Sequence, residues 1–176
     1  LTGVRLPEGL TGLGGGKGTN GVFEDSGITA ITIPASVATI ADRAFAGCTA
    51  LASIAVDEDN TAYKSVDGNL YSADGATLLQ YAPGKAAEAF EIPAGVTAIA
   101  AGAFAGSNIN SVTIPESVTS LGEGAFAGCE NLTSVDMSAS SLTAIPASAF
   151  EGCGGLDTVT LPANLTAIGD YAFAGT

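Results

Sequence analysis

The sequence predicts an α/β solenoid, a right-handed coil with short parallel strands, little regular helix and one β-hairpin insertion. Three observations predict it. A phrase beginning Ala-Phe recurs about every 23 residues, an apolar pattern recurs upstream of that phrase, and apolar residues make up 47% of the 176-residue chain. Although Gly is abundant, the Val, Ile, Leu and Phe residues are too many and too regular for a flexible linker.

The recurring phrase reads "AFAGC" at residues 44–48 and 125–129. The same slot holds six Phe residues, separated by 22, 59, 22, 24 and 23 residues: Phe23, Phe45, Phe104, Phe126, Phe150 and Phe173. We read the interval of 59 as two repeats of about 23 residues plus an insertion of about 13. Each Phe is expected to stack on the Phe of the next coil. The Gly two residues later is expected to leave the turn in a left-handed conformation, as at Gly47, Gly128 and Gly152.

The upstream pattern reads apolar-x-x-apolar-x-apolar-Pro and then a second apolar pair, as in residues 28–40. The first apolar residues would face inward from a short strand, Pro would end the strand, and the second pair would form the opposite wall. Seven copies begin near residues 1, 28, 51, 87, 109, 132 and 156, with Ala87 in the first slot of the fourth. We expect one domain over residues 1–176. Because neither end resembles a polar cap, we expect a segment of a longer protein.

The insertion interrupts the third copy at residues 57–84. Within it "NLYS" and "TLLQY" are strand-like and "ADGA" supplies a turn, which predicts a β-hairpin. Three of the four Tyr residues lie there, Tyr63, Tyr71 and Tyr81, with Lys64 beside the first. We expect this hairpin to protrude and to be the first candidate for a protein contact. The alternative is that the Tyr side chains only pack the hairpin onto the coils.

Composition and charge exclude several classes of function. The net charge of −13, from 5 basic and 18 acidic residues, argues against binding nucleic acid or anionic lipid. No apolar run is long enough to span a membrane, and the first residues do not resemble a signal peptide. The chain has no His, so catalytic arrangements that need His are impossible. We expect a protein that is not an enzyme and needs no cofactor.

The remaining candidates for chemistry are weak. Glu88 and Glu91 share a predicted strand and could serve as paired carboxylates of a glycosidase, but solvated acids are the simpler interpretation. The acidic run "DEDN" at residues 57–60 lacks the spacing of a calcium loop, so we expect a solvated turn. Cys129 and Cys153 occupy one slot of adjacent coils and could approach disulfide distance. Parallel ladder side chains have poor geometry for that bond, so three buried free thiols are favoured, with Cys48.

The outward positions of the predicted strands form the other candidate surface. Most are Thr, Ser or Ala and none is aromatic, which offers few anchors for a partner. The polar residues that we single out for partner binding are Glu88, Glu91, Asn110, Thr113, Asp136 and Asp157. The alternative is a plain solvated sheet of β-forming residues.

Residues 31–54, "ITIPASVATIADRAFAGCTALASI", resemble the leucine-rich repeat family and most closely its BspA-like bacterial subclass. The chain departs from the general family pattern in having Pro where Asn or Cys follows the strand. The resemblance implies a secreted or cell-surface bacterial protein that adheres by binding a host or microbial surface protein, possibly a glycan. A structural spacer that displays another domain is the alternative function. Unpaired coil surface at a solenoid end also makes end-to-end self-association plausible.

Overall fold

The coils are built from strands, turns and bends. The computed structural model describes residues 1–14, 21–86 and 88–176, and these ranges contain fifteen strands and no helix. The protein is therefore a β-solenoid rather than the expected α/β solenoid. The turn residues bond to the third residue before them or to a neighbouring coil, so they form no helical ladder. Ala87, the first slot of the fourth copy, lies outside the described residues.

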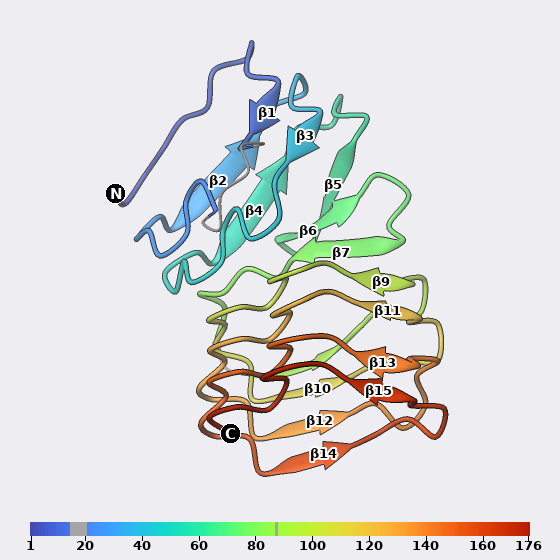
Figure 1. The fold of residues 1–176 in the computed structure, drawn as a ribbon. Helices are drawn as coiled ribbons and strands as arrows, with labels where there is room; N and C mark the ends of the chain where they lie inside the picture. Colours follow the sequence, from blue (N-terminus) through green and yellow to red (C-terminus); the bar gives the residue numbers. More distant parts are fainter. Residues whose placement is uncertain (15–20, 87) are drawn as a thin grey trace.

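The first wall of the solenoid consists of parallel strands stacked edge to edge (Figure 1). Strands β8, β10, β12 and β14 form one four-stranded sheet, and β2 pairs with β4 in another. In the three-residue strands the central residue points inward, as Val112 does, and Val112 pairs in register with Phe90 and Val135. The bounds are β2 (Ala30–Ile33), β4 (Ser53–Val56), β8 (Ala89–Glu91), β10 (Ser111–Thr113), β12 (Ser134–Asp136) and β14 (Thr158–Thr160).

The second wall carries the second apolar pair of each copy. Its strands pair in parallel as β1–β3, β7–β9–β11 and β13–β15. The Pro93 carbonyl accepts a hydrogen bond from the Val96 N–H (2.9 Å), which closes the turn between the two walls. The bounds are β1 (Gly12–Leu13), β3 (Thr39–Ile40), β7 (Thr77–Gln80), β9 (Ala98–Ile99), β11 (Ser120–Leu121), β13 (Ala144–Ile145) and β15 (Ala167–Ile168).

The recurring Phe rings stack from coil to coil, which confirms the prediction from the repeat. The ring centroids of Phe104 and Phe126 lie 4.6 Å apart, those of Phe126 and Phe150 5.1 Å, and those of Phe150 and Phe173 5.2 Å. A separate stack joins Phe23 to Phe45 at 5.7 Å. The four central rings are fully buried: Phe45, Phe104, Phe126 and Phe150.

The backbone of the Ala-Phe turns forms a third connection between coils. The Phe104 N–H donates to the Ala125 carbonyl (2.7 Å), and the Phe126 N–H donates to the Ala149 carbonyl (2.8 Å). The expected left-handed glycines are confirmed, with φ of 67° at Gly47, 70° at Gly128 and 73° at Gly152. We call this stack of turns the turn column.

The turn column is continuous across the insertion. The Gly47 N–H donates to the Ala105 carbonyl (3.0 Å), so the coils of Phe45 and Phe104 are direct neighbours there. On the first wall, by contrast, β4 and β8 belong to separate sheets. The intervening residues enter the strand side as an antiparallel meander of β5 (Tyr63–Val66), β6 (Asn69–Ser72) and β7. Because extra chain widens only one side of the stack, the solenoid bends at this point (Figure 1).

The segment 57–84 therefore differs from the protruding hairpin expected at this place. Strands β6 and β7 pair antiparallel across the turn at residues 73–76, but β5 adds a third strand. Strand β7 also pairs in parallel with β9 and so belongs to the second wall. The physical reason is the apolar pair at Leu78 and Leu79, which can be buried on both faces only inside the stack.

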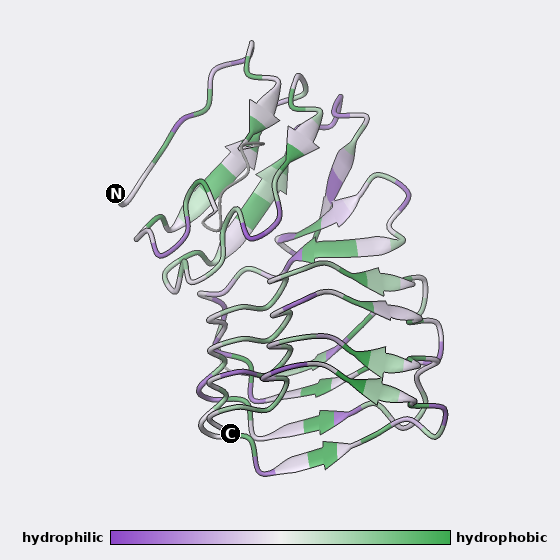
Figure 2. Cartoon of the chain, in the orientation of Figure 1, coloured by the Kyte–Doolittle hydropathy of each residue, from purple (hydrophilic) through white to green (hydrophobic). Residues whose placement is uncertain are grey.

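The meander separates two hydrophobic cores. Leu70 packs in the core of the first coils, whereas the next residue, Tyr71, packs in the core of the later coils. This split follows from the alternation of side chains along a strand. Figure 2 shows the apolar residues along the strands of both stacks. The Gln80 amide, buried between the stacks, donates to the Tyr81 and Ala103 carbonyls (2.9 and 3.0 Å).

The Cys slot of the phrase is a hydrogen-bonding position between coils. The thiols of Cys48, Cys129 and Cys153 are buried and unbridged, and each donates to a Phe carbonyl of the preceding coil at 2.8, 3.0 and 3.0 Å. Burial raises the pKa of Cys48, and a hydrogen bond with the Cys129 side chain together with burial raises that of Cys153. These two thiols are therefore poor nucleophiles at neutral pH.

The thiols give the first testable prediction. In the native protein at pH 8, Ellman's reagent is expected to react with few or none of the three thiols within minutes, because all are buried. In denaturant all three are expected to react, and the absorbance at full reaction counts them. If only one thiol reacts in denaturant, the other two form a disulfide, which would contradict the unbridged arrangement.

The Phe stack gives the second prediction. Phe126→Ala is expected to lower the free energy of unfolding by about 3–5 kcal/mol, because Phe126 is fully buried and stacked on both sides. Phe173→Ala is the matched control, since Phe173 is half-buried and, among the described residues, stacks on Phe150 alone. Urea titration of both variants measures the loss. Equal losses, or a larger one at Phe173, would show that stacking between coils does not stabilise the fold.

Candidate functional site

The outer face of β8, β10, β12 and β14 gathers six of the ten residues singled out from the sequence. Along one edge of this face, Thr113 pairs in register with Glu91 on one side and Asp136 on the other. All three side chains are exposed, because they alternate with the buried central residues of their strands. Strand spacing places neighbouring Cα atoms in this row about 4.8 Å apart. We call this surface the sheet face.

A second row runs just before the strands begin. The Asn110 N–H donates to the Glu88 carbonyl (3.2 Å), and the Thr133 N–H donates to the Asn110 carbonyl (2.8 Å). The Asp157 N–H continues the row by donating to the Thr133 carbonyl (3.0 Å). These side chains are exposed, and Glu88, Asn110 and Asp157 each stand one residue before a strand that bears the sheet face.

The sheet face is acidic. It carries four exposed carboxylates and no Lys or Arg within residues 88–91, 110–113, 133–136 and 157–160. Hydrogen bonds from the side chain and the backbone N–H of Ser138 (N–H to Oδ1, 2.9 Å) lower the pKa of Asp136. That carboxylate therefore stays charged at more acidic pH than an ordinary Asp. The arrangement suits a partner with positive charge.

Two of the predicted contact residues are core residues instead. Tyr71 is 3% exposed and Tyr81 is 4% exposed, and burial raises the pKa of both phenols. Tyr81 stacks on Phe104 with a centroid distance of 5.2 Å, so it is the first ring of the stack that continues through Phe126. Sequence reasoning missed this role because Tyr81 stands outside the Ala-Phe phrase. The structure therefore agrees with the packing alternative for these two rings.

The other two insertion residues are half-buried on β5. The Tyr63 hydroxyl accepts a hydrogen bond from the Ile40 N–H (2.8 Å) and donates to the Ala38 carbonyl (3.4 Å). Lys64 lies near Asp74, where it contributes to lowering the pKa of that carboxyl after the hydrogen bonds from Ser72 and Ala76. Tyr63 thus connects the meander to β3, whereas Lys64 lies beside the turn within the meander, and both lie apart from the two rows of the sheet face.

The acidic run 57–60 is a structured turn. The Asn60 amide donates to the Pro34 and Val37 carbonyls (2.8 and 2.9 Å), and the Asp59 N–H donates to an Asp57 carboxylate oxygen (3.0 Å). Over the described ranges, no group of three or more acidic or Cys residues is arranged to hold a metal ion. Nor do those ranges include a helix long and apolar enough to cross a membrane.

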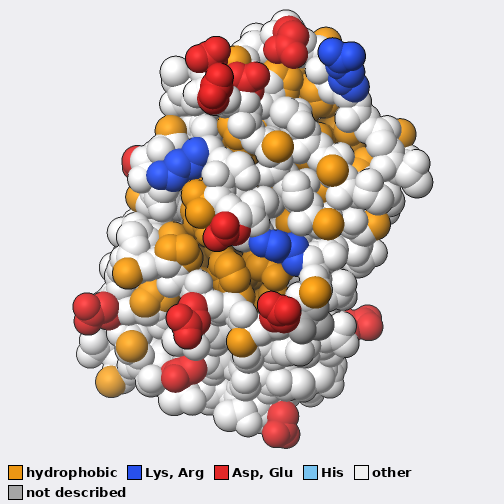
Figure 3. All heavy atoms as spheres, turned by 180° about the vertical axis from the view of Figure 1, so that it is seen from behind, with side chains coloured by type: hydrophobic (Ala, Val, Ile, Leu, Met, Phe, Trp, Pro, Cys, Tyr) orange, Lys and Arg blue, Asp and Glu red, His pale blue; other side chains and the backbone are white. Residues whose placement is uncertain are grey.

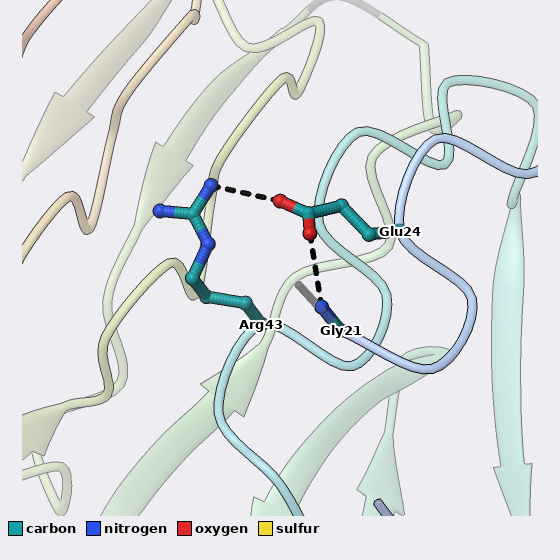
Figure 4. Close-up of polar contacts among 3 residues, drawn as sticks. All are labelled: Gly21, Glu24 and Arg43. Atoms are coloured by element: carbon teal, nitrogen blue, oxygen red, sulfur yellow. Dashed lines mark hydrogen bonds and ion pairs between the residues drawn. The ribbon is translucent and has the colours of Figure 1, made fainter. Parts of the chain in front are cut away.

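Sequence reasoning missed a hollow on the turn column, at the inner side of the bend. It has a volume of about 480 Å³ and is lined from both sides of the insertion, by Glu24 and Arg43 on one side and by Asn108 and Glu130 on the other. Arg43 Nη2 forms an ion pair with Glu24 Oε1 at 2.9 Å, and Glu24 Oε2 accepts a hydrogen bond from the Gly21 N–H (Figure 4). No sequence signal marks this hollow, because its two sides meet only through the bend.

The repeats match a known family. The description "BspA type Leucine rich repeat region" applies to residues 16–68 and 83–176, in six copies. No curated protein matches the chain.

Several solved structures share the fold. A leucine rich cell surface protein of Faecalibacterium prausnitzii is 34% identical, with a TM-score of 0.85 over 99% of this chain and 51% of that one. The pneumococcal vaccine antigen PcpA is 30% identical, with a TM-score of 0.77 over 84% of this chain and 36% of that one. A leucine-rich repeat protein of Bacteroides ovatus is 31% identical, with a TM-score of 0.54 over 84% of this chain and 35% of that one.

The chain thus spans about half the length of the Faecalibacterium protein and about a third of the other two. The repeat description covers well over half of the chain. The strand ladders, the stacked Phe rings and the left-handed glycines are the structural features that recur with these sequence repeats. This chain belongs to the BspA-type leucine-rich repeat family.

Proposed function

We propose that this chain is a non-enzymatic segment of a bacterial surface protein and that its sheet face binds a basic protein on a host or microbial surface. The observation that carries the proposal is the pair of acidic rows on one open face of β8, β10, β12 and β14. A surface location is supported by the Faecalibacterium neighbour, which is described as a cell surface protein.

The chemistry of the face favours electrostatic recognition. Its side chains are short and polar, and aromatic anchors of the kind that dominate tight interfaces are missing from its exposed rows. Charge complementarity can still steer a basic partner and fix its register over the two rows. Such binding is expected to be moderate in affinity and sensitive to ionic strength.

A structural spacer is the second candidate. Two walls of parallel strands, the turn column and the Phe stacks join each coil to the next, which favours a stiff body. In that case the sheet face is merely solvated, and another part of the longer protein contacts the partner.

The third prediction distinguishes these functions. The fluorescently labelled protein is expected to adhere to intact epithelial or bacterial cells, less at high salt, and not after trypsin removes their surface proteins. Neutralising the sheet face should weaken adherence about tenfold or more, because the partner's positive charges lose their counterparts. The variant carries Glu88→Gln, Glu91→Gln, Asp136→Asn and Asp157→Asn.

A matched control removes the same charge from other exposed positions, through Asp42→Asn, Glu58→Gln, Asp59→Asn and Glu123→Gln. The control should adhere as the unmodified protein does. Equal losses in both variants would mean that only net charge matters. Adherence that survives trypsin would contradict a protein partner, and no adherence to any cell type would favour the spacer.

A further inference from the structure

Strand β8 has an open edge inside the solenoid. It is the first strand of its four-stranded sheet and, among the described strands, pairs with β10 alone. The burial of the central residues agrees with this, because Val112 and Val135 are 2% and 1% exposed whereas Phe90, at the centre of β8, is only half-buried. The chain continues on both sides of β8, so this edge lies within the stack of coils and not at its end.

The backbone groups on this edge belong to Ala89 and Glu91. Alternate residues of a parallel strand bond to opposite neighbours. The Ile92 N–H donates to the Thr113 carbonyl of β10 (3.3 Å), so Ile92 and, two residues earlier, Phe90 bond toward β10. The N–H and C=O groups of Ala89 and Glu91 therefore point the other way, and within the described part of the chain they have no backbone partner.

The meander covers the facing edge of β4 but leaves that of β8 open. The Ile54 N–H of β4 donates to the Gly68 carbonyl (2.8 Å), and the Ser65 hydroxyl donates to the Ile54 carbonyl (2.6 Å). Strand β7 pairs instead with β9 on the second wall. The insertion thus leaves one unpaired strand edge on the first wall, and such an edge is a template for another extended chain.

The surroundings of the open edge are acidic. Residues 86–176 contain nine acidic residues and no Lys or Arg. Among the described residues, the lower part of the molecule seen from behind accordingly shows acidic side chains and no basic one (Figure 3). Lys85 precedes the strand, but its ammonium group donates to the Asp67 carbonyl and lies over the Tyr81 ring. Glu91 is the charged residue on the strand itself, and its side chain is exposed.

The charges disfavour a second copy of the chain on this edge and favour a basic peptide. Pairing of two β8 strands would bring acidic side chains together, and like charges on neighbouring strands are destabilising. A basic side chain on the outer face of an added strand would instead lie beside Glu91 and the acidic rows of the sheet face. An apolar side chain on its inner face would cover the half-exposed Phe90.

We infer that the open edge of β8 binds an extended peptide in which basic and apolar residues alternate, by adding it as a further strand to the sheet. Its backbone bonds with Ala89 and Glu91, while its side chains alternate between the sheet face and Phe90. This inference rests on the proposed function and deepens it, because it gives the basic partner of the sheet face a specific mode of binding.

The fourth prediction tests strand addition with the full chain and a fluorescein-labelled peptide of seven residues in which Lys and Val alternate. Fluorescence anisotropy is expected to show saturable binding of this peptide. The same residues arranged as a Lys block and a Val block should bind about tenfold more weakly, because they cannot present one basic and one apolar face. A peptide of alternating Glu and Val should not bind.

Amide hydrogen exchange measured by NMR shows whether the peptide joins the backbone. In the protein alone, the Ala89 and Glu91 amides are expected to exchange quickly and the Phe90 amide slowly. Saturating peptide should slow exchange at Ala89 and Glu91 by about tenfold or more, because their N–H groups gain acceptors. Phe90 should change little, since its N–H already bonds toward β10.

Ala89→Pro removes the N–H on the open edge without changing the charge of the protein. Proline is tolerated on an edge strand where the missing N–H faces outward, so the variant should fold. It should weaken binding of the alternating peptide by about tenfold or more. Ala89→Ser, which keeps the N–H at the same position, is the matched control and should bind as the unmodified protein does.

The inference is overturned if the alternating peptide does not bind, or if it binds without slowing exchange at Ala89 and Glu91. It is also overturned if those two amides are already protected in the protein alone at high concentration, because a second copy would then occupy the edge. Any of these results together with charge-dependent adherence to cells would refute strand addition and leave the proposed function standing. Peptide binding without adherence to any cell would instead contradict the proposed function and not the open edge.

Discussion

The structure depends on the contact between successive turns of the turn column. Within each of the two stacks a Phe ring stacks on the ring of the next coil while backbone N–H groups reach carbonyls of that coil, and across the insertion the Gly47–Ala105 hydrogen bond continues the column. A Phe ring buries a large apolar area, and the backbone bonds fix the register in which it does so. Left-handed residues on both sides of the Phe, most of them glycine, close the turn tightly enough for this contact. The two walls of strands follow from this spacing, because each coil must then lie one strand spacing from the next.

The same constraint explains the bend. The chain between Phe45 and Phe104 is too long for a single coil, yet the turn column allows no gap, since Gly47 bonds directly to Ala105. The excess chain is placed on the strand side, where a three-stranded antiparallel meander can pair with β9 and bury residues on both of its faces. Two cores, a bend and a hollow on the inner side are the consequences. The sheet face lies on the first wall of the later coils, whereas the hollow lies on the turn column.

The parts of this account that could be predicted from the sequence are those that repeat. The Phe stacking, the left-handed glycines and the parallel strands each leave a signal in the sequence about every 23 residues. The rows of Glu91, Thr113 and Asp136 follow from the same register. The features that could not be predicted from the sequence each occur at one place in the chain and do not repeat. Tyr81 takes the place of a Phe in the aromatic stack although it does not belong to the Ala-Phe phrase. The two sides of the hollow, at Arg43 and Asn108, come together only because the insertion bends the stack. Little regular helix was expected, and the described residues contain none, because the turn residues bond between coils.

Amide hydrogen exchange measured by NMR tests the continuity of the turn column most directly. The amides of Gly47, Gly106 and Gly128 each donate to the next coil of the column, at 3.0, 2.9 and 2.8 Å. If the column is continuous across the insertion, the Gly47 amide will exchange as slowly as the other two, because opening it requires separating two packed coils. Rapid exchange at Gly47 alone, with Gly106 and Gly128 protected, would mean that the two stacks are not joined there and that neither the bend nor the hollow exists in solution.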